Sequence, residues 1–128
     1  MRFMMMVKAT PASEAGTMPT QAQIAEMGAY SEQLSKAGVL VDLAGLHPTS
    51  RGARIRFSGG GERSLTNGPF GDGGQIVSGY WIIDVKSPEE ALEWAMRAPD
   101  PAFGSGHGEI ELRRFFEASD FEPAATSD

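Results

Sequence analysis

TNGPFGDGGQIVSGYWIIDVKSPEEALEWA, residues 66–95, places a tight turn, a glycine-rich loop, a strand and a helix in one continuous run. The turn is predicted at Asn67–Phe70, because Asn, Gly and Pro favour turn conformations. Val77–Val85 is rich in β-branched and aromatic residues and is predicted to be a strand. Ser87 and Pro88 then predict a helix start, since Ser is a favoured N-cap and Pro is favoured at the first helical position.

The helix that follows Ser87 is predicted to bury one face. Glu90, three residues after Ser87, completes a capping box. Apolar residues at helical spacing predict a buried stripe that consists of Ala91, Leu92, Ala95 and Met96. Pro99 and Pro101 end the helix, because proline removes a backbone donor and clashes with the preceding turn.

Upstream, the sequence predicts a strand, a helix and a second strand. Arg2–Lys8 is apolar on both alternating sets of residues, which is typical of a strand covered on both faces. Residues 9–19 are rich in Pro, Gly and small polar residues and are predicted to be a loop. Thr20 fits the N-cap of a helix that ends at Gly38, and Val39–Leu46 follows as a strand.

The middle and the end of the chain add a hairpin and a last strand. Ala53–Ser58 alternates between apolar and basic residues, and Glu62–Thr66 is its short return strand. Glu109–Phe116 is predicted to be the last strand of a domain that spans residues 1–117. Residues 118–128 are predicted to form a small, acidic, loosely held tail. This order predicts an α+β fold of the ferredoxin-like βαββαβ type, with both helices on one face of an antiparallel sheet.

The other face of that sheet requires a cover. Both faces of the first strand are apolar, yet only two helices are predicted, and they occupy one face. The simplest cover is the same face of a second copy of the chain. The sequence therefore predicts a homodimer.

Composition excludes several classes of function. The chain has 128 residues, 41% of them hydrophobic, which suits one domain with an ordinary core. The net charge of −6 argues against nucleic acid or an acidic membrane as a partner. The absence of cysteine removes disulfides, thiolate nucleophiles and cysteine zinc sites. With no apolar run of about 20 residues and no signal-peptide pattern, we expect a soluble, cytoplasmic protein.

Several motifs together resemble the YCII-related family of the "DGPF" type. The resemblance covers most of the chain and rests on Gly45-Leu46-His47-Pro48, Asn67-Gly68-Pro69-Phe70, Ser78-Gly79-Tyr80-Trp81, Ser87 to Ala95, and Gly108-Glu109-Ile110-Glu111-Leu112-Arg113. It implies a dimeric α/β barrel. Relatives on this barrel include small-molecule isomerases and monooxygenases, and some are proposed to use a His–Asp pair. Fold alone does not assign the reaction.

The chain departs from the family pattern at the turn and in the loop after it. Asn67 stands where the family usually has Asp, and the acidic and basic residues that usually follow the turn are replaced by Gly71-Asp72-Gly73-Gly74-Gln75. Asp72 is the only acid left in this loop, so an activity that needs the lost charges is in doubt.

His47 and Asp72 are the candidate catalytic pair, and Asp42 is the alternative carboxylate. Histidine titrates near neutral pH, and a carboxylate can orient its ring and stabilise its charged form. The other histidine, His107, also lies in a loop, and ordinary solvent exposure in a loop is the simpler explanation of both histidines. A metal held by both histidines with Glu109 or Asp72 is possible by ligand type. The two histidines lack metal-ligand spacing, so no metal site is predicted.

The candidate ligand-binding residues are Asn67, Phe70, Tyr80, Trp81 and His107. Aromatic residues of the strand could line an apolar pocket at the sheet face between two subunits, although core or interface packing explains them as well. The loop glycines could bind an anion through backbone N–H groups, but turn formation accounts for them too. No cofactor motif is present: no Gly-Lys-Ser/Thr sequence follows a glycine loop, and no glycine loop precedes a helix.

The sequence therefore predicts a small-molecule-binding protein or a cofactor-free enzyme of unassigned reaction, with its pocket at the inter-subunit sheet face. The alternative is a regulatory or protein-interaction module whose function lies in its surface and tail. The four arginines at positions 51, 54, 56 and 63 make the middle hairpin locally basic. They could bind a carboxylate or an acidic partner, or form a solvated face.

Overall fold

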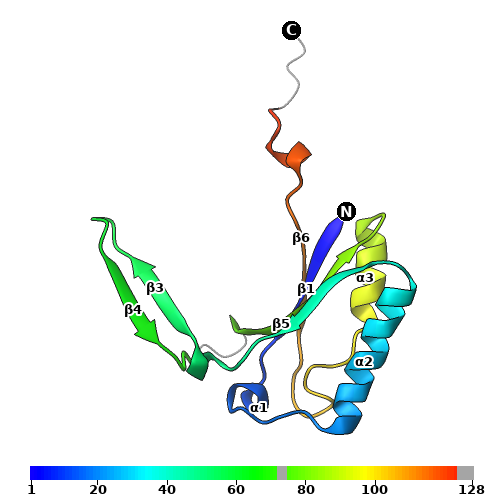
Figure 1. The fold of residues 1–128 in the computed structure, drawn as a ribbon, viewed down its shortest axis with the longest axis horizontal. Coiled ribbons are helices and arrows are strands. Elements are labelled where there is room, and N and C mark those ends of the chain that lie inside the picture. The colour runs from blue at the N-terminus through cyan, green and yellow to red at the C-terminus, as the bar shows by residue number, and fades with distance from the viewer. Residues whose placement is uncertain (72–74, 124–128) are drawn as a thin grey trace.

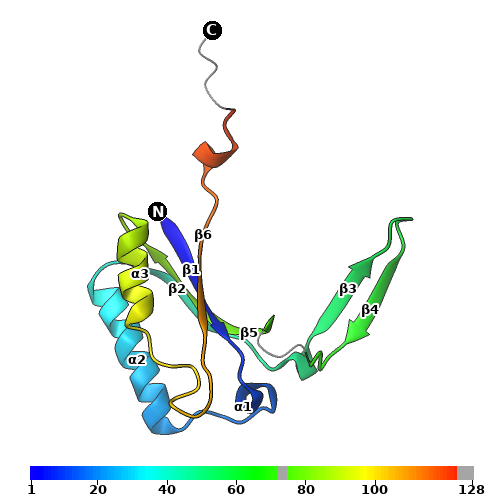
Figure 2. The same cartoon turned by 180° about the vertical axis from the view of Figure 1, so that it is seen from behind.

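A four-stranded antiparallel sheet forms the centre of the computed structural model, which describes residues 1–71 and 75–123. Its strands lie in the order β2-β5-β1-β6. Their bounds are Leu40–Gly45 for β2, Val77–Asp84 for β5, Arg2–Lys8 for β1 and Ile110–Arg114 for β6. Two helices, α2 (Gln21–Lys36) and α3 (Pro88–Met96), cover one face of this sheet (Figures 1 and 2). The predicted ferredoxin-like α+β fold is confirmed.

A separate hairpin leaves the domain between β2 and β5. It consists of β3 (Ala53–Phe57) and β4 (Arg63–Asn67), which pair only with each other. The hairpin projects from the side of the sheet opposite to α2 and α3 (Figures 1 and 2). We call it the arm.

Three short helical segments complete the described chain. They are α1 (Pro11–Glu14), η1 (Thr49–Arg51) and η3 (Ala118–Phe121). The sequence predicted a loop over residues 9–19, whereas α1 lies within it. A capping box explains the helical turn: the Thr10 hydroxyl accepts from the Ser13 backbone N–H, and the Ser13 hydroxyl accepts from the Thr10 N–H.

The core lies between the sheet and the two helices. Alternate residues of β1 and β5 point to this side, where Met5 and Ile83 are fully buried. Tyr30 of α2 meets Trp81 and Trp94 edge-on, with ring centroids 5.1 and 6.4 Å away. These aromatic contacts fasten both helices to the sheet.

The buried face of α3 differs from the predicted stripe. Ala91 is buried as expected, but Leu92 is 55% exposed and Met96 is 85% exposed. Trp94 takes the core position instead, at 9% exposure. The Tyr30 hydroxyl donates to the Trp94 backbone carbonyl at 2.6 Å, which places the Trp94 side of α3 toward α2. Leu92 and Met96 therefore face outward.

The face of the sheet away from the helices is partly exposed. The other alternating set of residues points to this side, with Met4 paired to Ile82 and Met6 paired to Tyr80 across β1 and β5. All four are half-buried. We call this surface the open face. Among the described residues, no helix has both the length and the apolarity needed to cross a membrane.

Candidate functional site

An apolar pocket lies between the first half of α2 and the β2–β5 edge of the sheet. Its volume is about 310 Å³. The α2 side is lined by Ile24, Met27, Gly28 and Ser31, and the sheet side includes Leu43 and Trp81. The four helix positions follow the i, i+3, i+4, i+7 spacing that shares one helix face. The pocket therefore lies on the helix side of the sheet.

Two glycines shape this pocket. Gly28 presents no side chain to it, and a Cβ built there would meet no atom within 4 Å. Gly79 of β5 is buried beside β2, and a Cβ there would lie 2.9 Å from the Ala44 carbonyl oxygen. Because Gly28 has no side chain, the helix side of the pocket keeps open space. Gly79 permits the close approach of β5 and β2.

The polar groups of the pocket wall are largely satisfied by one another. The Trp81 indole N–H donates to the Ser31 hydroxyl at 3.0 Å, and this hydroxyl donates to the Met27 carbonyl at 2.9 Å. Among the described residues, no charged side chain belongs to the lining. Such a wall favours a neutral ligand, because a buried charge would find no counter-charge there.

The predicted residues Tyr80 and Trp81 both line the pocket. Trp81 is buried, with 3% of its surface exposed, and belongs to the helix side of β5. Tyr80 is its neighbour in the strand and pairs with Ala44 of β2 and Met6 of β1, so its side chain points to the opposite face of the sheet from that of Trp81. The strand that the sequence singled out therefore forms one wall of the pocket.

The other two predicted turn residues, Asn67 and Phe70, lie at the base of the arm. The Phe70 N–H donates to the Thr49 hydroxyl at 3.2 Å. Thr49 in turn donates to Glu14 twice, from its N–H at 2.9 Å and from its hydroxyl at 2.5 Å. The Arg54 guanidinium stacks 4.0 Å from the centre of the Phe70 ring, and Asn67 is exposed opposite Ala53. These contacts join the turn to η1 and α1.

Gly68 shows why this turn needs its glycine. A Cβ at Gly68 would lie 1.7 Å from the Thr49 carbonyl oxygen, so any side chain is excluded. Its N–H donates to the Gly52 carbonyl at 2.9 Å. The turn motif therefore closes the base of the arm, which is a structural role.

Comparison with known proteins gives the family. The model of the YCII-related domain matches residues 1–116. The chain belongs to the YCII-related family. An uncharacterised protein from Rhizobium meliloti (strain 1021) is 33% identical over 82 residues, which are 62% of this chain and 65% of that relative. The alignment thus spans somewhat less than two thirds of the relative.

A solved structure shares the fold of this YCII-related chain. It is 5-chloro-2-hydroxyhydroquinone dehydrochlorinase from Burkholderia phenoliruptrix AC1100, in complex with 2,5-dihydroxybenzoquinone. The TM-score is 0.50 and the identity 16%, over 94% of this chain and 98% of the other. At this identity the likeness supports the fold.

The candidate catalytic pair of this YCII-related chain is described only in part. His47 is exposed and follows β2, two residues after Gly45 of the pocket lining. The intervening Leu46 N–H donates to the carbonyl of Ser78, another lining residue, at 2.8 Å. The backbone therefore carries His47 past the β2 end of the pocket. Asp72 lies outside the described residues, so its pairing with His47 stays a prediction.

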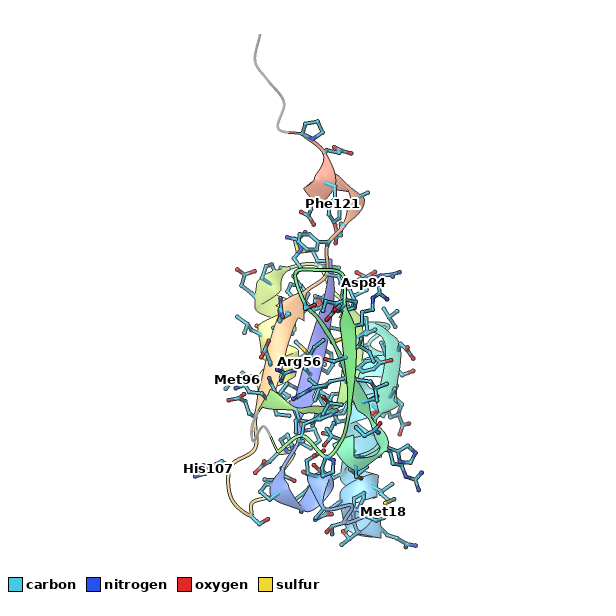
Figure 3. All side chains as sticks on the ribbon, turned by 90° about the vertical axis from the view of Figure 1, so that its left-hand side faces the viewer. Met18, Arg56, Asp84, Met96, His107 and Phe121 are labelled. Carbon is cyan, nitrogen blue, oxygen red and sulfur yellow. The ribbon has the colours of Figure 1, made fainter. Side chains whose placement is uncertain are left out.

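His107 lies in the loop between α3 and β6 and is exposed. Figure 3 shows it at the edge of the molecule, pointing away from the sheet. Asp100 organises this loop by accepting from the Ala102 and Gly104 N–H groups at 2.8 and 3.0 Å. Within the described residues, no group of three or more His, Cys, Asp or Glu side chains is placed to hold a metal ion.

Sequence reasoning missed Met27, Gly28 and Ser31 as pocket residues. Gly28 gave no signal because glycine within a helix has many explanations. The pocket arises from the approach of α2 to an edge strand distant in sequence, and periodicity does not specify that approach.

Proposed function

We propose that this chain binds a small, neutral, largely apolar molecule in the pocket between α2 and the β2–β5 edge. The observation that carries the proposal is the pocket itself: about 310 Å³, walled by apolar side chains and glycines, with its serine and indole already bonded. Small-molecule sites begin at about this volume and have predominantly apolar walls. Trp81 offers an aromatic surface to a ring-shaped ligand.

The fold supports a ring-shaped ligand in general terms. The dehydrochlorinase of the same fold is known in complex with a dihydroxybenzoquinone, a single planar ring. A neutral ring of similar size is the ligand class we propose, without extending the dehydrochlorination to this chain.

The binding proposal is tested by a thermal-shift screen of the purified protein. One set of compounds holds neutral one-ring and two-ring aromatics, and a matched set holds carboxylates and amines of the same size. We expect the neutral set alone to raise the melting temperature, because a ligand that binds only the folded state stabilises it by mass action. Stabilisation by charged compounds alone would contradict an uncharged ligand.

We also propose that the chain catalyses a reaction of the bound molecule. His47 is our candidate proton carrier, with Asp72 as its orienting carboxylate and without a cofactor. Its support is the position of His47 just past the strand end that lines the pocket. An exposed imidazole at a pocket rim can exchange protons with a bound molecule near neutral pH.

The catalytic assignment predicts a separation of binding from turnover. His47→Ala should leave ligand affinity within about threefold while turnover of any substrate falls by about 100-fold or more. His107→Ala, a second exposed loop histidine, is the matched control and should change neither quantity. Equal turnover in wild type and His47→Ala would remove His47 from the mechanism.

The homodimer is also a proposal. Its support is the half-buried apolar set on the open face, which would be covered by the same face of a second copy. A further ligand site between two such faces, as the sequence predicted, would require that dimer. The cytoplasmic location stays a prediction.

An interaction module is the second candidate function, and the arm favours it. The arm is exposed along almost its whole length and carries Ile55, Phe57 and Leu65 at 48%, 67% and 62% exposure. A module of this kind would bind a protein through the arm and leave the α2 pocket unused. Failure of the ligand screen together with capture of a partner that needs Phe57 would favour it.

A further inference from the structure

One face of the arm is mainly apolar and carries Arg63 at its tip, and the other face carries two further arginines. Ile55 lies directly opposite Leu65, and Phe57 opposite Arg63, so their side chains share one face of the hairpin. The Arg63 guanidinium lies 4.7 Å from the centre of the Phe57 ring. Arg54 and Arg56 alternate onto the other face. A two-stranded hairpin is marginal on its own, so packing of its apolar face against another surface would stabilise the arm.

The segment after β6 is also apolar, and its charge is opposite to that of the arm. Phe116 and Phe121 are 77% and 71% exposed, and their rings lie 5.0 Å apart. Three acidic residues, Glu117, Asp120 and Glu122, surround them, and residues 115–123 contain no basic residue. Residues 53–67 of the arm contain three arginines against a single glutamate. One surface is apolar and basic, and the other is apolar and acidic.

Within one copy, the arm and this segment lie far from each other. The arm leaves the domain at the end of the sheet near α1, whereas the segment after β6 extends from the opposite end, beside the N-terminus (Figures 1 and 2). Viewed from the open face, the arm stands in front of the sheet and Phe121 lies beyond its far end (Figure 3). The two complementary surfaces therefore cannot meet in the chain as it stands.

A symmetric pair of chains would bring them together. If two copies face each other through their open faces, and the two-fold axis turns one copy end over end, each arm reaches toward the end of its partner that carries Phe116 and Phe121. Two-fold symmetry makes the contact twice, so each arm is matched by one acidic segment. Opposite charges then orient the pairing and the apolar side chains leave water.

We propose that the arm of one copy clasps the segment Phe116–Phe121 of a second copy of this chain. The apolar face of the arm packs on the two phenylalanine rings, and Arg63, which shares that face with Phe57, lies against Asp120 or Glu122. This contact is additional to the pairing of the open faces and involves no residue of the α2 pocket.

Engineered cysteines test this contact directly, because the chain has no cysteine of its own. Two separate variants, Leu65→Cys and Phe121→Cys, are mixed and oxidised with oxidised glutathione. We expect the mixed disulfide between the two variants to form at least about tenfold faster than in either variant alone, since a disulfide requires Cβ atoms within about 4.5 Å. Met96→Cys, at a still more exposed position on α3, is the control and should cross-link with neither.

A second measurement does not depend on cross-linking. Phe57→Ser with Leu65→Ser should weaken dimerisation by at least about tenfold in sedimentation, and Met96→Ser should not. The mixed disulfide and the weakened dimer would together establish the clasp. Cross-linking of Leu65→Cys with itself would show an arm-to-arm contact, and a monomer at micromolar concentration would show no contact between copies. Either result overturns the proposal.

Discussion

Tyr30 is the residue on which the contact between the two helices depends. Its hydroxyl donates to the Trp94 carbonyl at 2.6 Å and its ring lies among two tryptophans. Burial raises the pKa of Tyr30 from its ordinary value of 10.0 to about 12, and the positive charge of Arg97 lowers the pKa in part. The folded protein therefore holds the phenol proton more tightly than the unfolded chain.

This raised pKa predicts a loss of stability in alkali. The contribution of the protonated Tyr30 to the free energy of unfolding is complete below pH 10. It is lost as pH rises toward about 12, because the unfolded chain releases the phenol proton first. Tyr30→Phe should cost about 1 kcal/mol at pH 7 for the lost hydrogen bond and should flatten the fall between pH 10 and 12. Urea titrations of both proteins across this range check it. Parallel pH curves for the two proteins would contradict it.

Gly68 is a second residue whose substitution should change the stability of the protein. The Cβ of Gly68→Ala would overlap the Thr49 backbone, which cannot move as a flexible side chain could. We expect a loss of more than about 2 kcal/mol in the local stability of the arm base, read as faster hydrogen exchange at Gly68 and Phe70. Gly59→Ala is the control, since its Cβ meets nothing within 4 Å. Unchanged exchange in Gly68→Ala would refute the structural role of the turn.

At the scale of elements, substitutions in α3 test whether Leu92 or Trp94 occupies the core position of this helix. Leu92→Ala should cost less than about 1 kcal/mol because Leu92 is 55% exposed, whereas Trp94→Ala should cost about 3–5 kcal/mol. Ser87→Ala removes the N-cap bond to the Glu90 N–H and should cost about 1 kcal/mol. Thermal unfolding of the three variants checks this order. A Leu92→Ala protein less stable than Trp94→Ala would return the helix to the orientation that periodicity predicted.

The same helix shows what sequence could and could not predict. Continuous apolarity along Arg2–Lys8 and the β-branched and aromatic residues of Val77–Val85 were enough to place the central strands, and Ser87 was enough to place the start of α3. Two stripes on α3 satisfy helical spacing, one through Leu92 and one through Trp94. The choice depends on the bond from Tyr30, a residue of another helix. Long-range contacts of this kind leave no local pattern.

Some residues of the candidate site could likewise be predicted from the sequence, and others could not. Tyr80 and Trp81 could be predicted because they lie in a strongly patterned strand that forms a wall of the pocket. The expected site at the sheet face was inferred from apolarity on both sides of a strand, which does not tell which side keeps an open space. The pocket found on the helix side depends on Gly28 and on the distance of α2 from an edge strand.

At the scale of the whole molecule, the proposed ligand pocket lies in the compact body, and two segments, the arm and the chain after β6, project from it. The pocket faces α2, the arm projects on the open side, and the segment after β6 extends beyond the end of the sheet beside the N-terminus (Figures 1 and 2). The proposed ligand pocket and the proposed clasp therefore use different surfaces. Loss of one is expected to leave the other intact.

Blocking the pocket tests the central claim most directly. Gly28→Leu should place its side chain in the pocket, where a Cβ meets no atom within 4 Å, while Ala29→Leu adds the same side chain at the next helix position, outside the lining. Each protein is titrated by calorimetry with the tightest neutral aromatic found in the screen. We predict affinity at least about tenfold weaker in Gly28→Leu and unchanged in Ala29→Leu. Equal affinity in Gly28→Leu and wild type would contradict the pocket as the binding site.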